Sequence, residues 1–214
     1  MSFGYLGDIS TKIKQQVKNQ GVISIAEAYE LEKAGQLGGS LELIEEKSIS
    51  GVSSAIFTSI KETKYNVHLL EIIDYQPVSD NTDIRVRFFE SGVEETASVY
   101  QYAFEFMTAN GARGEVQDTT SDYIRATFNT GNATNEKSVS YNYYYNSGNS
   151  TKYSFQTMHT VLTNGSTALN VAFGGGSLPQ ASAVNQIKLY NASGNFSCTA
   201  KLYGVKEIWV TLDY

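Results

Sequence analysis

Histidine, cysteine and acidic residues are the side chains of this sequence that could do chemistry, but their spacing does not bring a catalytic set together. The two histidines, His68 and His159, fall in different predicted strands, and a zinc or iron site built on both would lack a third ligand. The one cysteine, Cys198, rules out an internal disulfide and a multi-cysteine metal site. A single cysteine inside an alternating segment packs as a small apolar residue. With no nucleophile elbow, Walker loop or dinucleotide fingerprint, the sequence predicts no enzyme, no metal and no cofactor.

Acidic pairs and one glycine run are the other features that could form a ligand site. Glu45-Glu46 and Glu94-Glu95 are adjacent, and neighbours in a strand point to opposite faces, so neither pair forms a two-carboxylate site. The stretch 80–83 offers oxygens to calcium but lacks the ligand count and the glycine of a dedicated loop, so calcium there stays open. The run Gly174-Gly175-Gly176 does not precede a helix, so we expect a turn with positive φ and not a phosphate cradle.

Charge and length limit the classes of partner. The chain has 214 residues and is 41% hydrophobic, enough for one domain with a sizeable core. Its 16 basic residues are outnumbered by 22 acidic ones without any basic run, which opposes binding to nucleic acid. No apolar stretch approaches the roughly 18 residues of a membrane span, and charged residues occupy the place of a signal-peptide core. We expect synthesis in a reducing cytosol, with no nucleic-acid partner and no membrane insertion.

Charge is also distributed unevenly along the chain. Residues 119–214 hold only 10 of the 38 charged side chains but 9 of the 15 tyrosines, among long tracts of Ser, Thr and Asn. Tyrosine gives a large contact area at little cost in side-chain entropy, and hydroxyls and amides adapt their hydrogen bonds. The composition of this part is therefore typical of a recognition surface.

Residues 1–39 are predicted to form two helices that dock against something else. Apolar residues of the first recur every fourth position, which makes a narrow stripe on one face. The second starts with a capping box, Ser24 to Glu27, and stops at Gly35. Neither is wide enough to be a domain, so we expect them to pack on neighbouring copies or a docking protein; the alternative is packing back on the chain's own sandwich. The predicted docking and oligomerisation residues are Ile9, Ile13, Val17, Ile25, Tyr29 and Leu31.

After Gly38-Gly39 the pattern changes to strands and stays there. Short alternating segments follow each other every 10–15 residues or so, separated by turn signals and without a helical pattern between them. We therefore predict a mainly β protein, in which residues 40–214 form a single antiparallel jelly-roll-like β-sandwich. The candidate strands are Leu41–Glu46, Ser54–Ile60, Tyr65–Asp74, Ile84–Glu90, Ser98–Thr108, Tyr123–Phe128, Ser138–Tyr145, Ser154–Leu162, Ala168–Phe173, Val184–Tyr190, Phe196–Tyr203 and Glu207–Leu212.

The segment Ser138–Tyr145 combines this alternation with a concentration of tyrosine. Val139 lies on the same face as Tyr141, Tyr143 and Tyr145, while Ser140, Asn142 and Tyr144 lie on the other. The predicted surface-recognition residues are Tyr141, Tyr143, Tyr144 and Tyr145.

Two stretches resemble a known class of proteins. The segment 35–50, GQLGGSLELIEEKSIS, is similar to the start of the β-module in small virion proteins of tailed bacteriophages, especially marine and cyanobacterial ones. The end of the chain, IKLYNASGNFS followed by LYGVK, is similar to their closing hairpin. The resemblance implies a non-enzymatic structural protein of the virion, and no catalytic residues come with it.

The resemblance and the residue pattern together set the functional expectations. The first is a tail fibre or appendage module that docks by its N-terminus and contacts the host surface, including a host glycan. The second is a capsid decoration protein that clamps shell subunits, and a third, of another class, is a carbohydrate-binding or carbohydrate-active sandwich. The expected partners are other virion proteins and other copies of the chain, as a homotrimer, a number taken from fibre and decoration proteins.

Overall fold

The computed structural model describes Ala26, Tyr29 and residues 39–206. Contacts within the chain divide it into two compact units, Met1–Ser40 and Leu41–Tyr214. Ala26 and Tyr29 are helical, and the Tyr29 side chain is exposed. The other predicted docking residues and the predicted strand 207–212 lie outside the described residues. Within the described part, no helix is long and apolar enough to cross a membrane.

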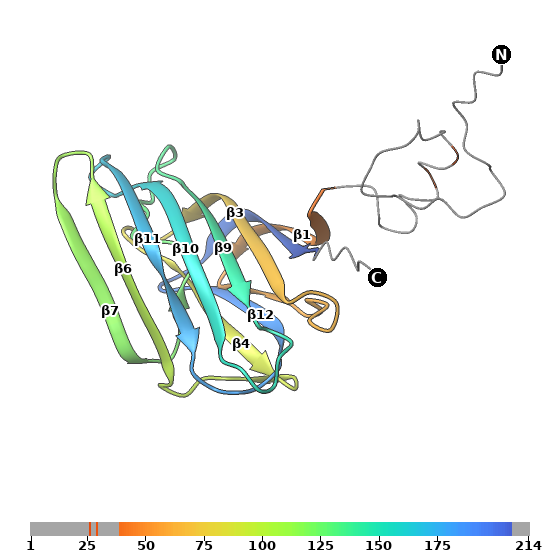
Figure 1. Cartoon of the computed structure of the whole chain (residues 1–214). Coiled ribbons are helices and arrows are strands. Elements are labelled where there is room, and N and C mark those ends of the chain that lie inside the picture. Colours follow the sequence, from red (N-terminus) through yellow and green to blue (C-terminus); the bar gives the residue numbers. More distant parts are fainter. Residues whose placement is uncertain (1–25, 27–28, 30–38, 207–214) are drawn as a thin grey trace, which may run out of the picture. The chain divides into compact units, whose positions relative to one another are not determined.

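The second unit is mainly β, and every strand pairing is antiparallel. One sheet has eight strands in the order β1-β13-β3-β9-β10-β11-β6-β7, and the other has the order β2-β12-β4-β5, with β8 also paired to β4 (Figure 1). The strands are β1 (Leu41–Val52), β2 (Ser54–Phe57), β3 (Val67–Pro77), β4 (Ile84–Glu90), β5 (Val93–Glu94), β6 (Tyr100–Thr108), β7 (Arg113–Ser121), β8 (Ile124–Arg125), β9 (Ser138–Tyr145), β10 (Ser154–Thr163), β11 (Leu169–Leu178), β12 (Val184–Asn191) and β13 (Phe196–Val205).

The strand order is that of a jelly roll. In the larger sheet, β13 lies between β1 and β3, and β3 also pairs with β9. The smaller sheet repeats this order: β12 lies between β2 and β4, and β4 also pairs with β8. The consecutive strands β1 and β2, paired with β13 and β12, therefore wrap around the barrel axis together with them, and each of these runs contributes one strand to each sheet. Strands β10, β11, β6 and β7 extend the larger sheet beyond β9. The predicted antiparallel jelly-roll-like sandwich is confirmed.

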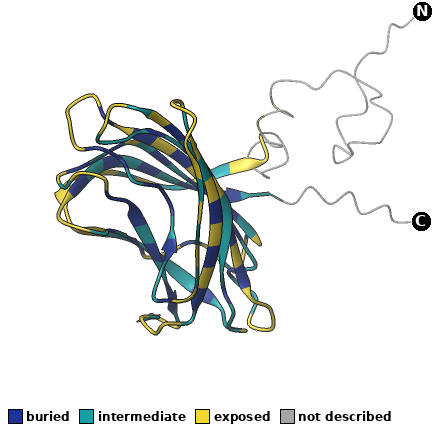
Figure 2. Ribbon diagram, turned by 90° about the vertical axis from the view of Figure 1, so that its left-hand side faces the viewer, coloured by how far each residue is buried: buried dark blue, intermediate teal, exposed yellow. Residues whose placement is uncertain are grey.

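The core lies between the sheets and follows from the period-2 alternation of the strands. Buried residues alternate with exposed or partly exposed ones along the strands of both sheets (Figure 2). Aromatic side chains fill much of the interior, and several of them meet edge to face, the geometry that ring electrostatics favours. The largest fully buried aromatic residues are Phe57, Tyr75, Phe88, Tyr100, Tyr144 and Phe196.

The glycine run lies inside a strand, so the predicted turn is wrong. Gly174, Gly175 and Gly176 belong to β11, and none of them has a positive φ. A Cβ on Gly174 would lie 2.3 Å from the carbonyl oxygen of Ala103 in β6, and one on Gly175 would lie 2.3 Å from the carbonyl oxygen of Gln156 in β10. Glycine is needed here because the neighbouring backbones approach closely, not because the chain turns.

The register gives the sandwich two distinct ends. Leu41 at the start of β1 pairs with Val205 at the end of β13, and Val205 also pairs with Val67 at the start of β3. The chain therefore enters and leaves the sandwich at one end of the larger sheet, called here the attachment end (Figure 1). The loops 78–83, 129–137, 164–168 and 192–195 lie at the opposite end, called here the loop end.

Candidate recognition surface

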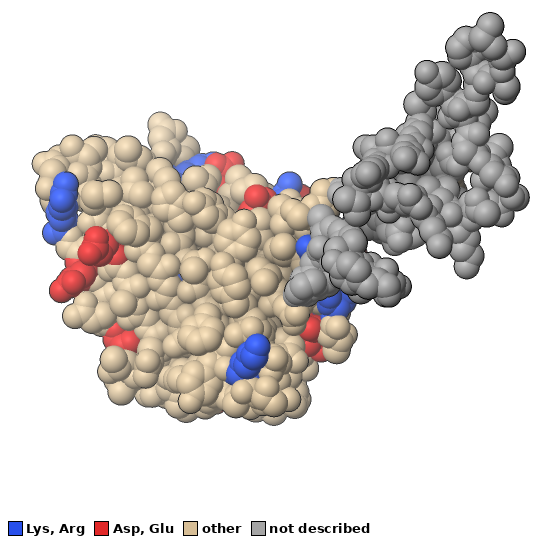
Figure 3. Space-filling model, in the orientation of Figure 1, with Lys and Arg blue, Asp and Glu red and all other residues tan. Residues whose placement is uncertain are grey.

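The outer side of the larger sheet carries a surface built from three adjacent strands. Strands β9, β10 and β11 contain no Asp, Glu, Lys or Arg at all. In the space-filling view, charged groups surround a broad uncharged area over these strands (Figure 3). The aromatic face is defined here as their outward side chains: Val139, Tyr141, Tyr143, Tyr145, Phe155, Thr157, His159, Val161, Leu169, Val171 and Phe173.

Strand register arranges the aromatic face in rows. Phe155 stands beside Tyr145, and the next row joins Thr157 to Tyr143 and Gly175. A third row runs from Phe173 through His159 to Tyr141, and a fourth row is made of valines. Cross-strand neighbours in such rows have Cβ atoms about 5 Å apart, so the side chains form one continuous surface.

Exposure shows that residues 39–206 leave this surface uncovered. Val139 and Tyr141 are each 47% exposed, and Leu169 is 49% exposed. Phe155 and Phe173 are 45% and 42% exposed. Single apolar residues at the surface are ordinary, but a continuous patch of large ones marks a site of interaction.

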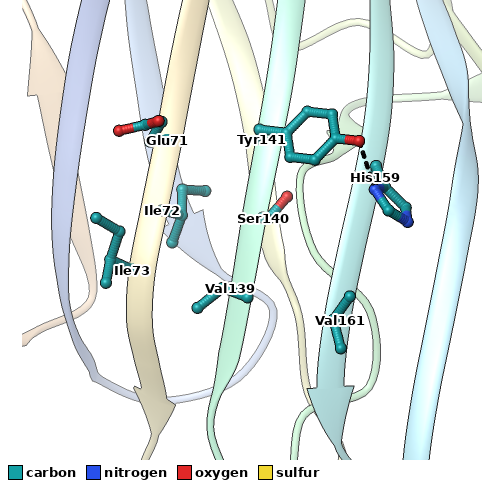
Figure 4. Close-up of a pocket in the computed structure, with 8 residues that line it drawn as sticks. All are labelled: Glu71, Ile72, Ile73, Val139, Ser140, Tyr141, His159 and Val161. Carbon is teal, nitrogen blue, oxygen red and sulfur yellow. Dashed lines mark hydrogen bonds between the residues drawn. The ribbon is translucent and has the colours of Figure 1, made fainter.

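A shallow depression of about 210 Å³ lies within the aromatic face and extends onto β3. Val139, Tyr141, His159 and Val161 line it from β9 and β10, and Glu71 lines it from β3 (Figure 4). The hydroxyl of Tyr141 lies 2.6 Å from Nδ1 of His159, and the two rings meet edge to face with centroids 5.0 Å apart. Most of the lining is apolar, which suits contact with a surface better than it suits bond-breaking chemistry.

Three of the four predicted recognition tyrosines lie on the aromatic face, and one does not. Tyr141, Tyr143 and Tyr145 point outward, and their rings follow each other along β9 with centroids 6.4 Å apart at each step. Tyr144 points into the core, is only 1% exposed and packs edge-on against Phe88. Its predicted surface role is wrong. Successive residues of a strand point to opposite sides, so Tyr144 faces the opposite sheet while its neighbours Tyr143 and Tyr145 face outward.

Sequence reasoning did not assign the residues that β10 and β11 add to this face. Phe155, His159 and Phe173 alternate with inward residues, which indicates that they share one face of their own strands. That these strands flank β9 side by side depends on the pairing order, which alternation within one strand does not contain.

Two reactive side chains noted in the sequence are buried structural residues. His68 is fully buried, its Nε2 donates a hydrogen bond to the carbonyl of Ile60 at 2.8 Å, and burial lowers the pKa of its imidazole. Cys198 is a free buried thiol, and burial raises its pKa to about 12. The buried thiol fits the packing role that the sequence indicated for Cys198, and the buried imidazole of His68 likewise belongs to the interior.

The acidic stretch 80–83 uses its carboxylates on groups of the chain itself. Oδ1 of Asp80 accepts hydrogen bonds from the backbone N–H groups of Asn81 and Asn132, at 2.9 and 3.3 Å. Asp83 is buried and pairs with Arg125 at 3.1 Å and with Arg85 at 3.5 Å. Among residues 39–206, no three His, Cys, Asp or Glu side chains come together in a way that could hold a metal ion.

The outer side of the smaller sheet has the opposite character. Arg87 on β4 pairs with Glu94 at 3.2 Å and with Asp122, and Lys188 on β12 reaches Glu94 at 2.8 Å. Arg85 stacks over the ring of Tyr123 at 3.9 Å. Because its charged side chains are paired with each other and with an aromatic ring, this side is a polar surface that favours exposure to solvent.

Comparison of the chain with family models, with curated proteins and with solved structures found no match.

Proposed function

We propose that this protein is a non-enzymatic structural protein of a tailed-phage virion, a projecting fibre or appendage module that docks through residues 1–39. The observation that carries the proposal is the division of the sandwich into an attachment end and a loop end. Leu41 and Val205 are paired at one end, so residues 1–40 join the module there. A module joined at one end presents the other end outward, as an appendage must.

The loop end is suited to presentation because hydrogen bonds tie its loops together. The N–H of Gly165 donates to Oδ1 of Asn81 at 3.0 Å, and the N–H of Asn132 donates to Oδ1 of Asp80 at 3.3 Å. Hydroxyl groups of Ser79 and Ser193 meet at 3.3 Å. Loops that are joined in this way present amides and hydroxyls in a fixed arrangement, which supports contact with a polar host surface such as a glycan.

The docking role is tested by the double substitution Ile13→Asp with Val17→Asp in the full chain. Charges in the apolar stripe of residues 1–39 should abolish incorporation into particles and leave the melting temperature of the sandwich nearly unchanged. Particles are purified from infected cells, and the chain is measured by immunoblot next to a major capsid protein. Normal incorporation together with a large fall in melting temperature would mean that the helices stabilise their own domain and anchor nothing.

A capsid decoration protein is the alternative within the same class. Both roles place many copies on each particle, and they differ in where the copies lie. Gold-labelled antibody against the chain, viewed by electron microscopy, places it on the head or on the tail. Labelling over the shell would replace the appendage proposal by the decoration one.

Carbohydrate binding is a second candidate because of the row of Tyr141, Tyr143 and Tyr145. Exposed aromatic rings stack on the apolar faces of sugars, and Glu71 beside the depression could accept hydrogen bonds from sugar hydroxyls. A glycan array combined with a hydrolysis assay on host envelope polysaccharide tests this candidate. Hydrolysis that is lost in a Glu71→Gln variant would overturn the non-enzymatic proposal.

A further inference from the structure

We propose that the aromatic face is the surface by which copies of this chain associate, each copy covering the face of another in a cyclic oligomer. The inference deepens the proposed function, on which it rests for the expectation that several copies act together. The inference identifies the side of the sandwich that is buried in the assembly. The attachment end and the loop end define the long axis of each copy.

The chemistry of the aromatic face differs from that of its surroundings. Its three strands lack charged side chains, and charges return on both flanks. On one flank Glu71 faces Lys201 across β3 and β13, and on the other Glu105 faces Glu115 across β6 and β7. An apolar centre surrounded by a charged rim is the usual anatomy of a protein–protein interface.

The size of the face fits association between two folded domains. Along the strands, the face spans about 20 Å from Phe155 to Val161 at the usual rise per residue. Across the sheet, the five adjacent strands β3, β9, β10, β11 and β6 span about as much at the usual spacing between strands. The projected area is therefore on the order of 400 Å², and the side chains standing on it expose more. That projected area, which already includes the rim strands β3 and β6, is about half of the roughly 800 Å² that each partner contributes to an interface of standard size, so the face suits a small interface.

A second copy fits this face better than the other occupants do. A strongly charged partner finds no complementary charge on β9, β10 or β11. A sugar needs hydrogen-bonding groups around its ring, but the Tyr141 hydroxyl is already bonded to His159, and two valines and two isoleucines are among the residues that line the depression. Another sheet face of the same composition offers flat apolar contact, and two such faces pack about 10 Å apart, as the sheets of a sandwich do.

The closed geometry of the proposed assembly follows from the position of the face. The aromatic face lies on a side of the sandwich, away from both the attachment end and the loop end. Copies that associate through it can therefore all be joined at one end and present their loops at the other. A face that packs on the same face of another copy makes an isologous contact, which closes with two copies about a two-fold axis and leaves no open face that would continue into a fibril.

Sedimentation velocity on the full chain at tens of micromolar tests the proposal. The unmodified chain should sediment as a discrete oligomer. Val139→Lys with Phe173→Lys, both at exposed positions of the face, should weaken association at least a hundredfold and give a monomer. The matched control is Val78→Lys with Val93→Lys, which puts the same charges on exposed apolar positions off the face and should leave the oligomer intact.

A labelling experiment keeps the test valid if the charged variant folds poorly. In Thr157→Cys the new thiol lies at the centre of the face, whereas Cys198 is buried. At high protein concentration its reaction with a maleimide should be at least tenfold slower than after dilution. A thiol in Thr96→Cys, exposed and outside the face, should react at the same rate in both conditions.

Several results would overturn the proposal. An unmodified chain that is monomeric at tens of micromolar would do so, as would an oligomer that survives Val139→Lys with Phe173→Lys and therefore forms elsewhere. A monomer that binds an immobilised glycan, and loses it in that variant, would make the face a carbohydrate surface. Self-association through the face by a chain that is absent from phage particles would overturn the proposed function and leave this inference standing.

Discussion

Replacing Gly174 by alanine adds a single methyl group at a point where the backbones of β11 and β6 approach each other closely. That methyl group would lie 2.3 Å from the carbonyl oxygen of Ala103 and 2.4 Å from Cβ of Phe104, whereas ordinary contact begins at 3.4 Å. The two strands must therefore separate by about 1 Å, the difference between the first and last of these distances. The oxygen of Ala103 is backbone and cannot turn away, so the strain falls on the pairing of β11 with β6.

Overpacking of this kind costs about 1–3 kcal/mol of unfolding free energy. For a domain of this size, each kcal/mol lowers the melting temperature by about 2–4 °C, so we expect a fall of about 2–12 °C. Thermal unfolding followed by circular dichroism measures it. Ser177→Ala, in the same strand but with a Cβ already present, is the control and should change the melting temperature by less than about 2 °C.

An opposite result would refute the reasoning from close approach. Alanine has fewer unfolded conformations than glycine, so where the native backbone leaves room the substitution stabilises a protein by about 0.4–1 kcal/mol. A melting temperature of Gly174→Ala at or above that of the unmodified chain would show that β11 and β6 do not lie as close together as described.

Three further predictions concern buried polar groups. Tyr75→Phe removes the 2.6 Å hydrogen bond to Oδ1 of Asn191 and should lower the unfolding free energy in urea by about 1–3 kcal/mol. Arg125→Leu leaves the buried carboxylate of Asp83 with Arg85 alone and should cost about 3–5 kcal/mol in the same assay; a loss below 1 kcal/mol would show that this pair is solvated. Burial raises the pKa of Cys198 to about 12 from its ordinary 9.0, so its stabilisation is complete below pH 9 and is lost as the pH rises toward 12. Unfolding free energy should then fall above pH 9 by at most about 1.4 kcal/mol per pH unit from this group, and Cys198→Ala should reduce that slope.

The sequence predicted those elements whose residues alternate strongly. The segment 138–145 was predicted with the bounds that β9 has, and β4 likewise. Strand β7 was missed because Arg113–Ser121 has one apolar residue, Val116: an edge strand buries little and carries charges that discourage further pairing. The alternation of apolar residues therefore does not predict a strand that is stabilised mainly by backbone hydrogen bonds to its neighbour and buries few of its own side chains.

The candidate surface was predictable in part for the same reason. Alternation placed Tyr141, Tyr143 and Tyr145 on one side of their strand, but the choice of side, inward or outward, needed the opposite sheet. Tyr144 was assigned to the surface without that information: a tyrosine suits a recognition surface, but the ring of Tyr144 points inward and packs against Phe88. His159 joined the surface only through its cross-strand neighbour Tyr141, a pairing over 18 positions of the sequence.

The pairing of Leu41 with Val205 also determines when the molecule can fold. The two residues are the first and last of the sandwich strands, so β13 reaches its place between β1 and β3 only after all the other strands have been synthesised. Until then β3 lacks a neighbour on one side, and the uncharged strands β9, β10 and β11 stand in an incomplete sheet. Chains dominated by such non-local pairings fold in milliseconds to seconds. While they fold, they expose unpaired strand edges that are prone to aggregation. Truncation just before β13 should therefore be far more damaging than its length suggests, because it removes the strand that joins the start of the sheet to the rest.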